Sequence, residues 1–286
     1  MTNLTPDQML ETIHRSLEEN SASFRKVPIP SKAELETYWR RVADRALPYL
    51  GNRLLNIVRP SPHGGVDYHR GALPPVPSAV HQLRIEKSDG TRGVRVWVDD
   101  LAGLLGLVEM DVIEIHPWGS TVDDIERPDL LAFNLKPGEG IEWRFVAETA
   151  RRLRQLLAAA DLDCWPKTTG DGSLHVMVPF ARKLIWEDAR GVAKDIAERL
   201  EATEPDRYTL SARTNRAGKL LIDYLRNGRG STVVGAYSPR ALPGSPIAAP
   251  IAWEDLDPGI HPDSFTMRKL PPDPDKSRTP KRPAHA

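Results

Sequence analysis

Hydrophobic and polar residues alternate along this chain with two different periods, which predict strands and helices. Residues 31–47 carry apolar side chains at helical spacing behind a Ser-x-x-Glu capping box, which predicts a helix beginning near Ser31. Elsewhere, short apolar or alternating runs indicate strands, and longer amphipathic runs indicate helices. Further helices are expected at 99–108, 143–160 and 186–202, and strands at 81–86, 93–98, 111–118, 129–135, 173–180 and 219–225.

This order of elements predicts an α+β, or mixed α/β, body that spans residues 27–270. Residues 1–26 place Leu4, Met9, Ile13 and Leu17 near one helical face, so we expect a helical extension ahead of that body. Residues 271–286 are Pro-rich and basic, without aliphatic side chains beyond Ala, and predict a disordered tail.

Composition limits the classes of function. Lys and Arg number 39 and so do Asp and Glu, so any nucleic-acid surface must be a local basic patch. The single cysteine, Cys164, excludes an intramolecular disulfide and a four-cysteine zinc site. No apolar run approaches 18 residues and no basic start precedes one, so we expect a cytoplasmic protein with no membrane partner.

The stretch "LLAFNLKPGEG", residues 130–140, ends a predicted buried strand with two polar side chains. Asn134 and Lys136 are two residues apart, so both face the same side of the strand. Enzymes present pairs of metal ligands in this way, yet one of these residues is a neutral amide and the other is a cation. Asp223 lies in another apolar strand, where a buried acid is costly unless it is paired, liganded or functional.

Two further segments carry candidate chemistry. His116 ends the apolar strand "VIEIHP", and His175 begins the strand that follows a loop of small residues. That loop, whose free N–H groups suit phosphate oxygens, contains Thr168, Thr169, Gly170 and Gly172. A packed histidine and a simple hairpin turn are the alternative interpretations. Local positive charge comes from Arg226, Arg229 and Arg240, each of which also suits a solvated surface.

The stretch "EKSDGTR", residues 86–92, matches the Lys-x-Asp-Gly-x-Arg signature in which a ligase lysine forms an adenylate. The same residues also suit a hairpin turn between two strands. The further carboxylate and lysine motifs that a ligase needs are not found in order downstream. The sequence therefore favours the turn, with Lys87 as an ordinary surface residue.

The order of segments resembles the polymerase domain of bacterial ligase D, a member of the archaeo-eukaryotic primase superfamily acting in non-homologous end joining. The resemblance covers residues 28–270 and implies a primase-type catalytic fold with strands flanked by helices. It also implies a nucleotidyltransferase ancestor that used Mn²⁺ or Mg²⁺, a nucleoside triphosphate and a primed or gapped DNA end. The segments that carry it include "VDDLAGLLGLVEMDVIEIHPWGS", "DDIERPDLLAFNLKPGEG", "WPKTTGDGSLHVMVPF" and "IDYLRNGRGSTVVGAYSPRALPG".

In the family, the segment matching "FNLKPGEG" reads Asp-x-Asp-Pro-Gly, and its two acids hold two metal ions together with a third acid. The resemblance makes Asp223 that third acid and the remaining metal ligand, while Asn134 and Lys136 replace the other two. Lys136 has no acceptor atom and adds positive charge. Two-metal nucleotidyl transfer is therefore expected to be impaired, and Glu139 beyond the turn is the nearest substitute acid.

The resemblance also suggests which residues contact substrates. His116, Thr169, Gly170, His175 and Arg240 match nucleotide-binding positions, whereas Gly172 replaces a phosphate-contacting lysine. For DNA, Lys32 matches one of two lysines that hold a 5′-phosphate, and the motif with the second is not found. Tyr68 and Arg70 replace two phenylalanines and a lysine, which keeps one ring for stacking and one charge.

Three functional hypotheses follow. The first is a domain that binds DNA ends or nucleotides in end joining, possessing little catalysis and working beside an end-joining ligase or Ku. The second is an active polymerase or primase that uses Asp223 with Asn134 or Glu139 in a rearranged metal site. The third is a protein-interaction scaffold, which salt-dependent DNA binding would argue against.

Overall fold

The computed structural model of the protein describes residues 29–87, 89–212, 216–256 and 260–272. The predicted N-terminal extension lies outside these ranges, and so does the predicted tail except for residues 271 and 272. Within the described ranges, no helix is long and apolar enough to cross a membrane.

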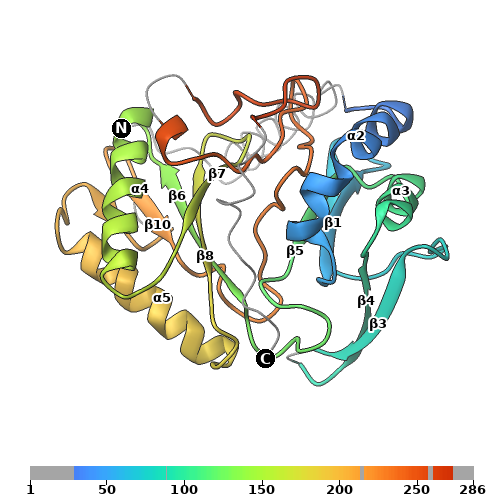
Figure 1. The fold of residues 1–286 in the computed structure, drawn as a ribbon, viewed down its shortest axis with the longest axis horizontal. Helices are drawn as coiled ribbons and strands as arrows, with labels where there is room; N and C mark the ends of the chain where they lie inside the picture. The colour runs from blue at the N-terminus through green and yellow to red at the C-terminus, as the bar shows by residue number, and fades with distance from the viewer. Residues whose placement is uncertain (1–28, 88, 213–215, 257–259, 273–286) are drawn as a thin grey trace, which may run out of the picture.

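Two β-sheets form the two halves of the molecule (Figure 1). In the first sheet, β1 (Leu55–Pro60) pairs antiparallel with β2 (Val66–His69), β4 (Arg92–Trp97) and β5 (Glu114–Pro117). Strand β3 (His81–Glu86) pairs with β4 as a hairpin. Strand β1 therefore connects the hairpin to the strand that carries His116.

The second sheet contains the two strands singled out for their polar residues. Its order is β7 (Trp165–Thr168), β8 (Leu174–Pro179), β6 (Leu130–Pro137), β10 (Leu220–Asp223) and β9 (Tyr208–Thr209). All neighbours are antiparallel except β10 and β9. This order places β6 and β10 side by side, as a shared site requires.

Helices cover the outside of both halves. Helix α2 (Lys32–Leu50) begins with the capping box of Ser31 and Glu34 that the sequence predicts, and it packs on α3 (Leu101–Glu109). Helices α4 (Trp143–Ala158) and α5 (Trp186–Glu201) pack on one face of the second sheet (Figure 1). A short 3₁₀ helix, η1, spans Glu254–Leu256.

The second sheet has one apolar face and one polar face because side chains alternate along each strand. Phe133 and Leu135 of β6 and Val176 of β8 are fully buried and belong to the core that α4 and α5 cover. Asn134 and His175 alternate with them and point to the opposite face, away from these helices. The apolar positions of β6 thus fix the direction of its polar side chains.

The segment after β10 joins the two sheets along that polar face. The side chain of Asn227 bonds both backbone groups of Ala132 on β6, each at 2.8 Å. Thr232 then forms a bridge with Trp118, and the Gly235 N–H donates to the Ile115 carbonyl of the first sheet at 2.8 Å. Residues 224–241 therefore hold the two sheets at a fixed separation.

The predicted mixed α/β class and the four helices predicted within residues 31–202 are confirmed, whereas four strands were missed. Strand β1 was missed because residues 55–58 are all buried, so its apolar run has no alternation to reveal it. Strand β7 holds a proline and a lysine, and β2 and β9 are only four and two residues long. Their place in the sheets comes from neighbours distant in sequence.

Candidate functional site

A row of four polar residues crosses the second sheet. Asp223 on β10 lies opposite Asn134 on β6, which lies opposite His175 on β8, which lies opposite Lys167 on β7. Residues directly opposite in a ladder point to the same face, so these four side chains lie next to one another. All four are buried. The sequence predicted three of them and missed Lys167.

Two of these residues, Asn134 and His175, line a cleft of about 360 Å³ between the two sheets. The cleft brings together seven of the predicted residues, and its other lining residues are Asp171, Arg226 and residues 230–234. The seven, from both sheets and the segment that joins them, are Tyr68, Arg70, His116, Asn134, Lys136, His175 and Arg240.

The Asp223 carboxylate, the predicted metal ligand, is paired with two cations. Lys136 Nζ lies 3.8 Å from its Oδ2, and Arg226 Nε lies 3.2 Å from the same oxygen. The Leu225 N–H lies 3.1 Å from Oδ1. An ammonium and a guanidinium group of the chain itself therefore lie against the predicted metal ligand.

The residues present do not fit a pair of divalent ions. Asn134 supplies one neutral oxygen, Oδ1, which is buried and has no hydrogen-bond partner in the described part of the chain. At an effective dielectric constant of about 20, each pair of unit charges about 4 Å apart interacts by about 4 kcal/mol, so Lys136 repels a dication strongly. No group of three or more His, Cys, Asp or Glu residues among those described has the arrangement of a metal site. Glu139 is exposed and does not line the cleft.

On the opposite wall, β5 presents Glu114 and His116 to the same face. Glu114 is buried, and its Oε2 lies 2.9 Å from His116 Nε2 and 3.1 Å from Arg240 Nε. The Ala241 N–H donates to its Oε1 at 2.8 Å. Because a carboxylate only accepts, the His116 proton lies on Nε2. Sequence reasoning missed Glu114, although the two-residue spacing that paired 134 with 136 also pairs 114 with 116.

Burial and neighbouring charges set the ionisation of the cleft. Burial lowers the pKa of His116 and, more strongly, that of His175, so both imidazoles are neutral at pH 7. Burial acts to raise the pKa of Glu114, but the His116 hydrogen bond and the Arg240 charge outweigh it and the pKa is lowered. Burial, with Arg240 nearby, lowers the pKa of Lys167 to about 7. Its ammonium donates to the Val234 carbonyl.

The predicted phosphate loop between β7 and β8 folds around Asp171. Asp171 Oδ1 lies 2.6 Å from Thr169 Oγ1 and 2.7 Å from Ser173 Oγ. Arg240 donates to the Thr169 carbonyl, and its Nη2 lies 3.2 Å from Asp171 Oδ2. Gly170 has a φ of +76°, and a Cβ there would come within 3.0 Å of Arg240 Cγ, so the loop requires this glycine. The sequence missed Asp171 as a functional residue.

Two of the three predicted DNA-binding residues lie at the cleft. The side chains of Tyr68 and Arg70 are exposed, and the Tyr68 hydroxyl lies 2.7 Å from Thr232 Oγ1. Lys32 does not line the cleft. Its ammonium donates to the Glu109 carbonyl at 2.9 Å and lies 2.9 Å from Asp111 Oδ1. The predicted contact of Lys32 with a 5′-phosphate therefore competes with an ion pair inside the chain.

The ligase-like motif at residues 86–92 forms the turn of the β3–β4 hairpin. Glu86 lies opposite Arg92 in the ladder, and the Lys87 N–H donates to the Thr91 carbonyl at 2.7 Å. Gly90 has a φ of +78°, which suits glycine in a turn. The turn interpretation is confirmed, and Lys87 does not line the cleft.

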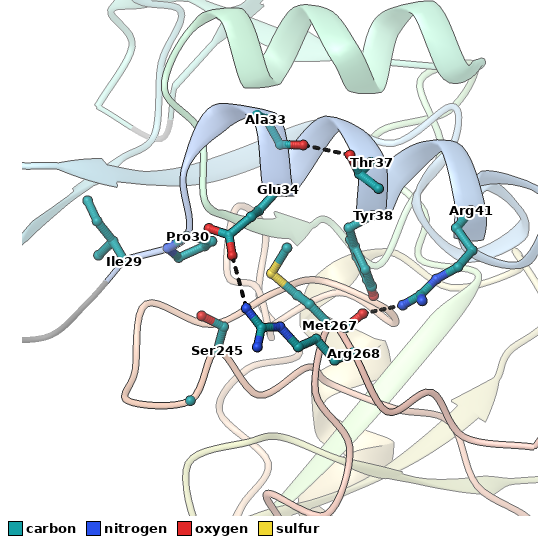
Figure 2. Close-up of a pocket in the computed structure, with 11 residues that line it drawn as sticks. Ile29, Pro30, Ala33, Glu34, Thr37, Tyr38, Arg41, Ser245, Met267 and Arg268 are labelled. Carbon is teal, nitrogen blue, oxygen red and sulfur yellow. Dashed lines mark hydrogen bonds and ion pairs between the residues drawn. The ribbon is translucent and has the colours of Figure 1, made fainter.

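A larger cavity, of about 640 Å³, lies between α2 and residues 244, 245, 267 and 268 (Figure 2). Its walls hold Tyr38 and Met267, the Arg41 guanidinium that donates to the Met267 carbonyl, and a Glu34–Arg268 ion pair at 3.4 Å. It contains none of the predicted site residues. Size alone therefore does not identify the functional site, and the convergence of charged and histidine side chains favours the smaller cleft.

Two known proteins are similar to most of this chain. The multifunctional non-homologous end joining protein LigD of Pseudomonas aeruginosa is 33% identical over 245 residues, which cover 84% of this chain and 29% of the relative. The bifunctional LigD of Bacillus subtilis is 26% identical over 242 residues, which cover 83% of this chain and 38% of the relative. The chain thus spans about a third of these relatives.

A solved structure shares the fold. The polymerase domain from Mycobacterium tuberculosis ligase D, in complex with DNA, superposes with a TM-score of 0.75 at 24% identity. The match covers 85% of this chain and 92% of that domain. The family model of the LigD primase-polymerase domain matches residues 31–280. The chain therefore belongs to the LigD primase-polymerase domain family.

Proposed function

We propose that this domain binds DNA ends and nucleotides in bacterial end joining and that its two-metal nucleotidyl transfer is impaired. One observation carries the proposal: Lys136 and Arg226 both approach the Asp223 carboxylate, at 3.8 and 3.2 Å. In a two-metal mechanism, carboxylates at this place hold the ions that activate the attacking hydroxyl and the leaving group. Two protein cations there oppose metal binding.

The remaining features of the cleft suit binding. Arg70, Lys136 and Arg226 place positive charge on its walls, which attracts a phosphate backbone. The side chain of Tyr68 is exposed at the cleft, where its ring can stack on an unpaired base. The solved polymerase domain with the same fold is in complex with DNA.

The proposed partners follow from the names of the relatives, which describe end-joining proteins of which this chain spans about a third. We propose that this domain acts at DNA breaks beside a ligase module, with Ku as a further candidate partner. Pull-down of the purified chain with an end-joining ligase or Ku, each with and without a DNA end, tests this assignment.

Two assays on one substrate test the proposed function. The substrate is a gapped duplex with a downstream 5′-phosphate, and binding is followed by fluorescence anisotropy in EDTA at 50 and 200 mM salt. We expect binding that weakens with salt, and that weakens further in Arg70→Ala but not in Asp67→Asn, a β2 neighbour outside the cleft. Salt-independent or absent binding would contradict DNA recognition and favour a protein-interaction scaffold.

The second assay follows nucleotide addition to the same duplex with Mn²⁺. We expect no extension. Templated extension that Asp223→Asn abolishes would instead establish an active nucleotidyltransferase with a rearranged site. The unpartnered Oδ1 of Asn134, opposite Asp223, is the observation that favours this second candidate.

A further inference from the structure

The donors of the loop between β7 and β8 are already occupied by a carboxylate of the loop itself, that of Asp171. The Asp171 side chain is 39% exposed, whereas Thr169 and Ser173, whose hydroxyls contact its carboxylate, are buried. The carboxylate therefore lies on the open side of the loop, where an incoming phosphate oxygen would meet these donors. Arg240 is likewise engaged, since it contacts Asp171, Glu114 and the Thr169 carbonyl.

Charge is distributed unevenly across the cleft. Where β5 faces the β7–β8 loop, Arg240 contacts the carboxylates of Glu114 and Asp171, which leaves one net negative charge. Lys167 lies opposite His175 in the sheet and donates to the Val234 carbonyl, and burial lowers its pKa to about 7, so its charge is weakened on this side. An additional anion on this side would meet two carboxylates and no uncommitted cation.

The side of the cleft next to β10 carries a net positive charge. Lys136 and Arg226 face the single carboxylate of Asp223, and both approach the same oxygen, so the two cations lie close together. Lys136 is 3.8 Å from that oxygen, longer than a hydrogen bond, so its N–H donors can turn to a ligand. Arg70, on the β2 wall of the same cleft, adds a further positive charge.

We propose that this cleft accepts a single phosphate monoester without metal, held by Lys136, Arg226 and Arg70, and that Asp171 excludes a triphosphate from the loop. The two net positive charges of these groups with Asp223 match a monoester, which carries about −1.5 to −2 at pH 7. The β- and γ-phosphates of a longer ligand would find the loop hydroxyls and Arg240 already occupied, so they would stay outside the loop and add no affinity. The inference rests on the proposed function, because it names the class of ligand for that site.

Isothermal titration calorimetry in EDTA at pH 7.5 tests this with deoxyadenosine, dAMP and dATP as ligands. We expect wild type to bind dAMP and dATP with dissociation constants within about threefold of each other and deoxyadenosine at least tenfold more weakly. Lys136→Met should weaken dAMP binding at least tenfold. A 5′-phosphorylated single strand then serves as competitor: displacement of dAMP assigns the phosphate to a DNA end, and no displacement assigns it to a free nucleotide.

Asp171 variants separate occupation of the loop from general charge. Asp171→Gly, which frees the loop donors and Arg240, should tighten dATP at least tenfold while dAMP changes less than threefold. Asp171→Asn removes the charge but keeps an acceptor for the hydroxyls, so its affinity for dATP should rise less. The affinity of Asp67→Asn for dATP should not rise. Wild-type preference for dATP by tenfold or more, an equal gain for both ligands in Asp171→Gly, or no dAMP binding would each overturn the inference. The anisotropy assay on the same samples reports separately whether DNA binding, and hence the proposed function, survives.

Discussion

Introducing carboxylates at positions 134 and 136 should convert the cleft into a metal site. It should also lower the stability of the metal-free protein by a measurable amount. In Asn134→Asp with Lys136→Asp, the group around Asp223 changes from two cations and one carboxylate to three carboxylates and Arg226. Residue 134 lies directly opposite Asp223, and residue 136 is on the same face of β6. Both new acids therefore lie on the same face of the sheet as Asp223, and the one at 134 lies directly opposite it.

The expected change in folding stability follows from the 3.8 Å between Lys136 Nζ and Asp223 Oδ2. Unit charges about 4 Å apart interact by about 4 kcal/mol at an effective dielectric constant of about 20. Lys136 is one-third exposed, so solvent screening reduces the lost attraction and the new repulsion to about 2 kcal/mol in total. For a domain of this size, that lowers Tm by about 4–8 °C without metal. Metal present at about 100 times its Kd returns about 2.7 kcal/mol.

Differential scanning calorimetry of wild type and double variant, with and without Mn²⁺, measures both effects. We expect Mn²⁺ to stabilise the double variant but not wild type. The added substitution Asp223→Asn should remove that stabilisation. If wild type gains as much from Mn²⁺ as the variant, or if the variant gains nothing, the account of a metal site lost through residues 134 and 136 is refuted.

Three further substitutions test single features. Lys32→Ala should weaken binding to 5′-phosphorylated duplex ends more than to unphosphorylated ends, and Asp111→Asn, which frees the Lys32 ammonium, should strengthen it; equal anisotropy changes for both ends would indicate general charge alone. Because Lys87 lies in a hairpin turn, wild type incubated with radiolabelled ATP should form no covalent adenylate, and a labelled band that Lys87→Ala abolishes would contradict this. Burial lowers the pKa of Lys167 to about 7, below the ordinary value of about 10.4, so the unfolded chain binds more protons between these values and stability should rise with pH across that window. Lys167→Met should flatten the rise in urea unfolding at pH 6.5 and 9, and parallel pH profiles would refute the prediction.

The sequence predicted the positions that depend on local pattern. The alternation of β6 identified Asn134 and Lys136 as one polar pair, and the isolated acid of β10 identified Asp223. It could not predict contacts between distant segments. The Ala241 N–H that holds Glu114 lies 127 residues away, and Arg240, which pairs with Asp171, lies 69 residues away.

The sequence also does not show whether a charged or hydrogen-bonding group is free to bind a ligand. From the sequence, the loop before β8 is a set of small residues that suits a phosphate, and Arg240 is a free cation. In the fold, the loop's own Asp171 contacts its hydroxyls, and Arg240 pairs both with Asp171 and with Glu114 of a distant strand. Whether a binding group is available therefore depends on tertiary neighbours, which neither spacing nor resemblance reveals.

The most direct test of the central claim, that the protein's own cations occupy the place of the metals, is electron paramagnetic resonance of Mn²⁺. Free Mn²⁺ is titrated in the presence of a nucleoside triphosphate, with and without the purified chain. The account predicts that the protein leaves the signal unchanged from triphosphate alone in wild type and that Asn134→Asp with Lys136→Asp produces a saturable loss. A saturable loss in wild type, approaching two ions per chain and abolished by Asp223→Asn, would contradict it.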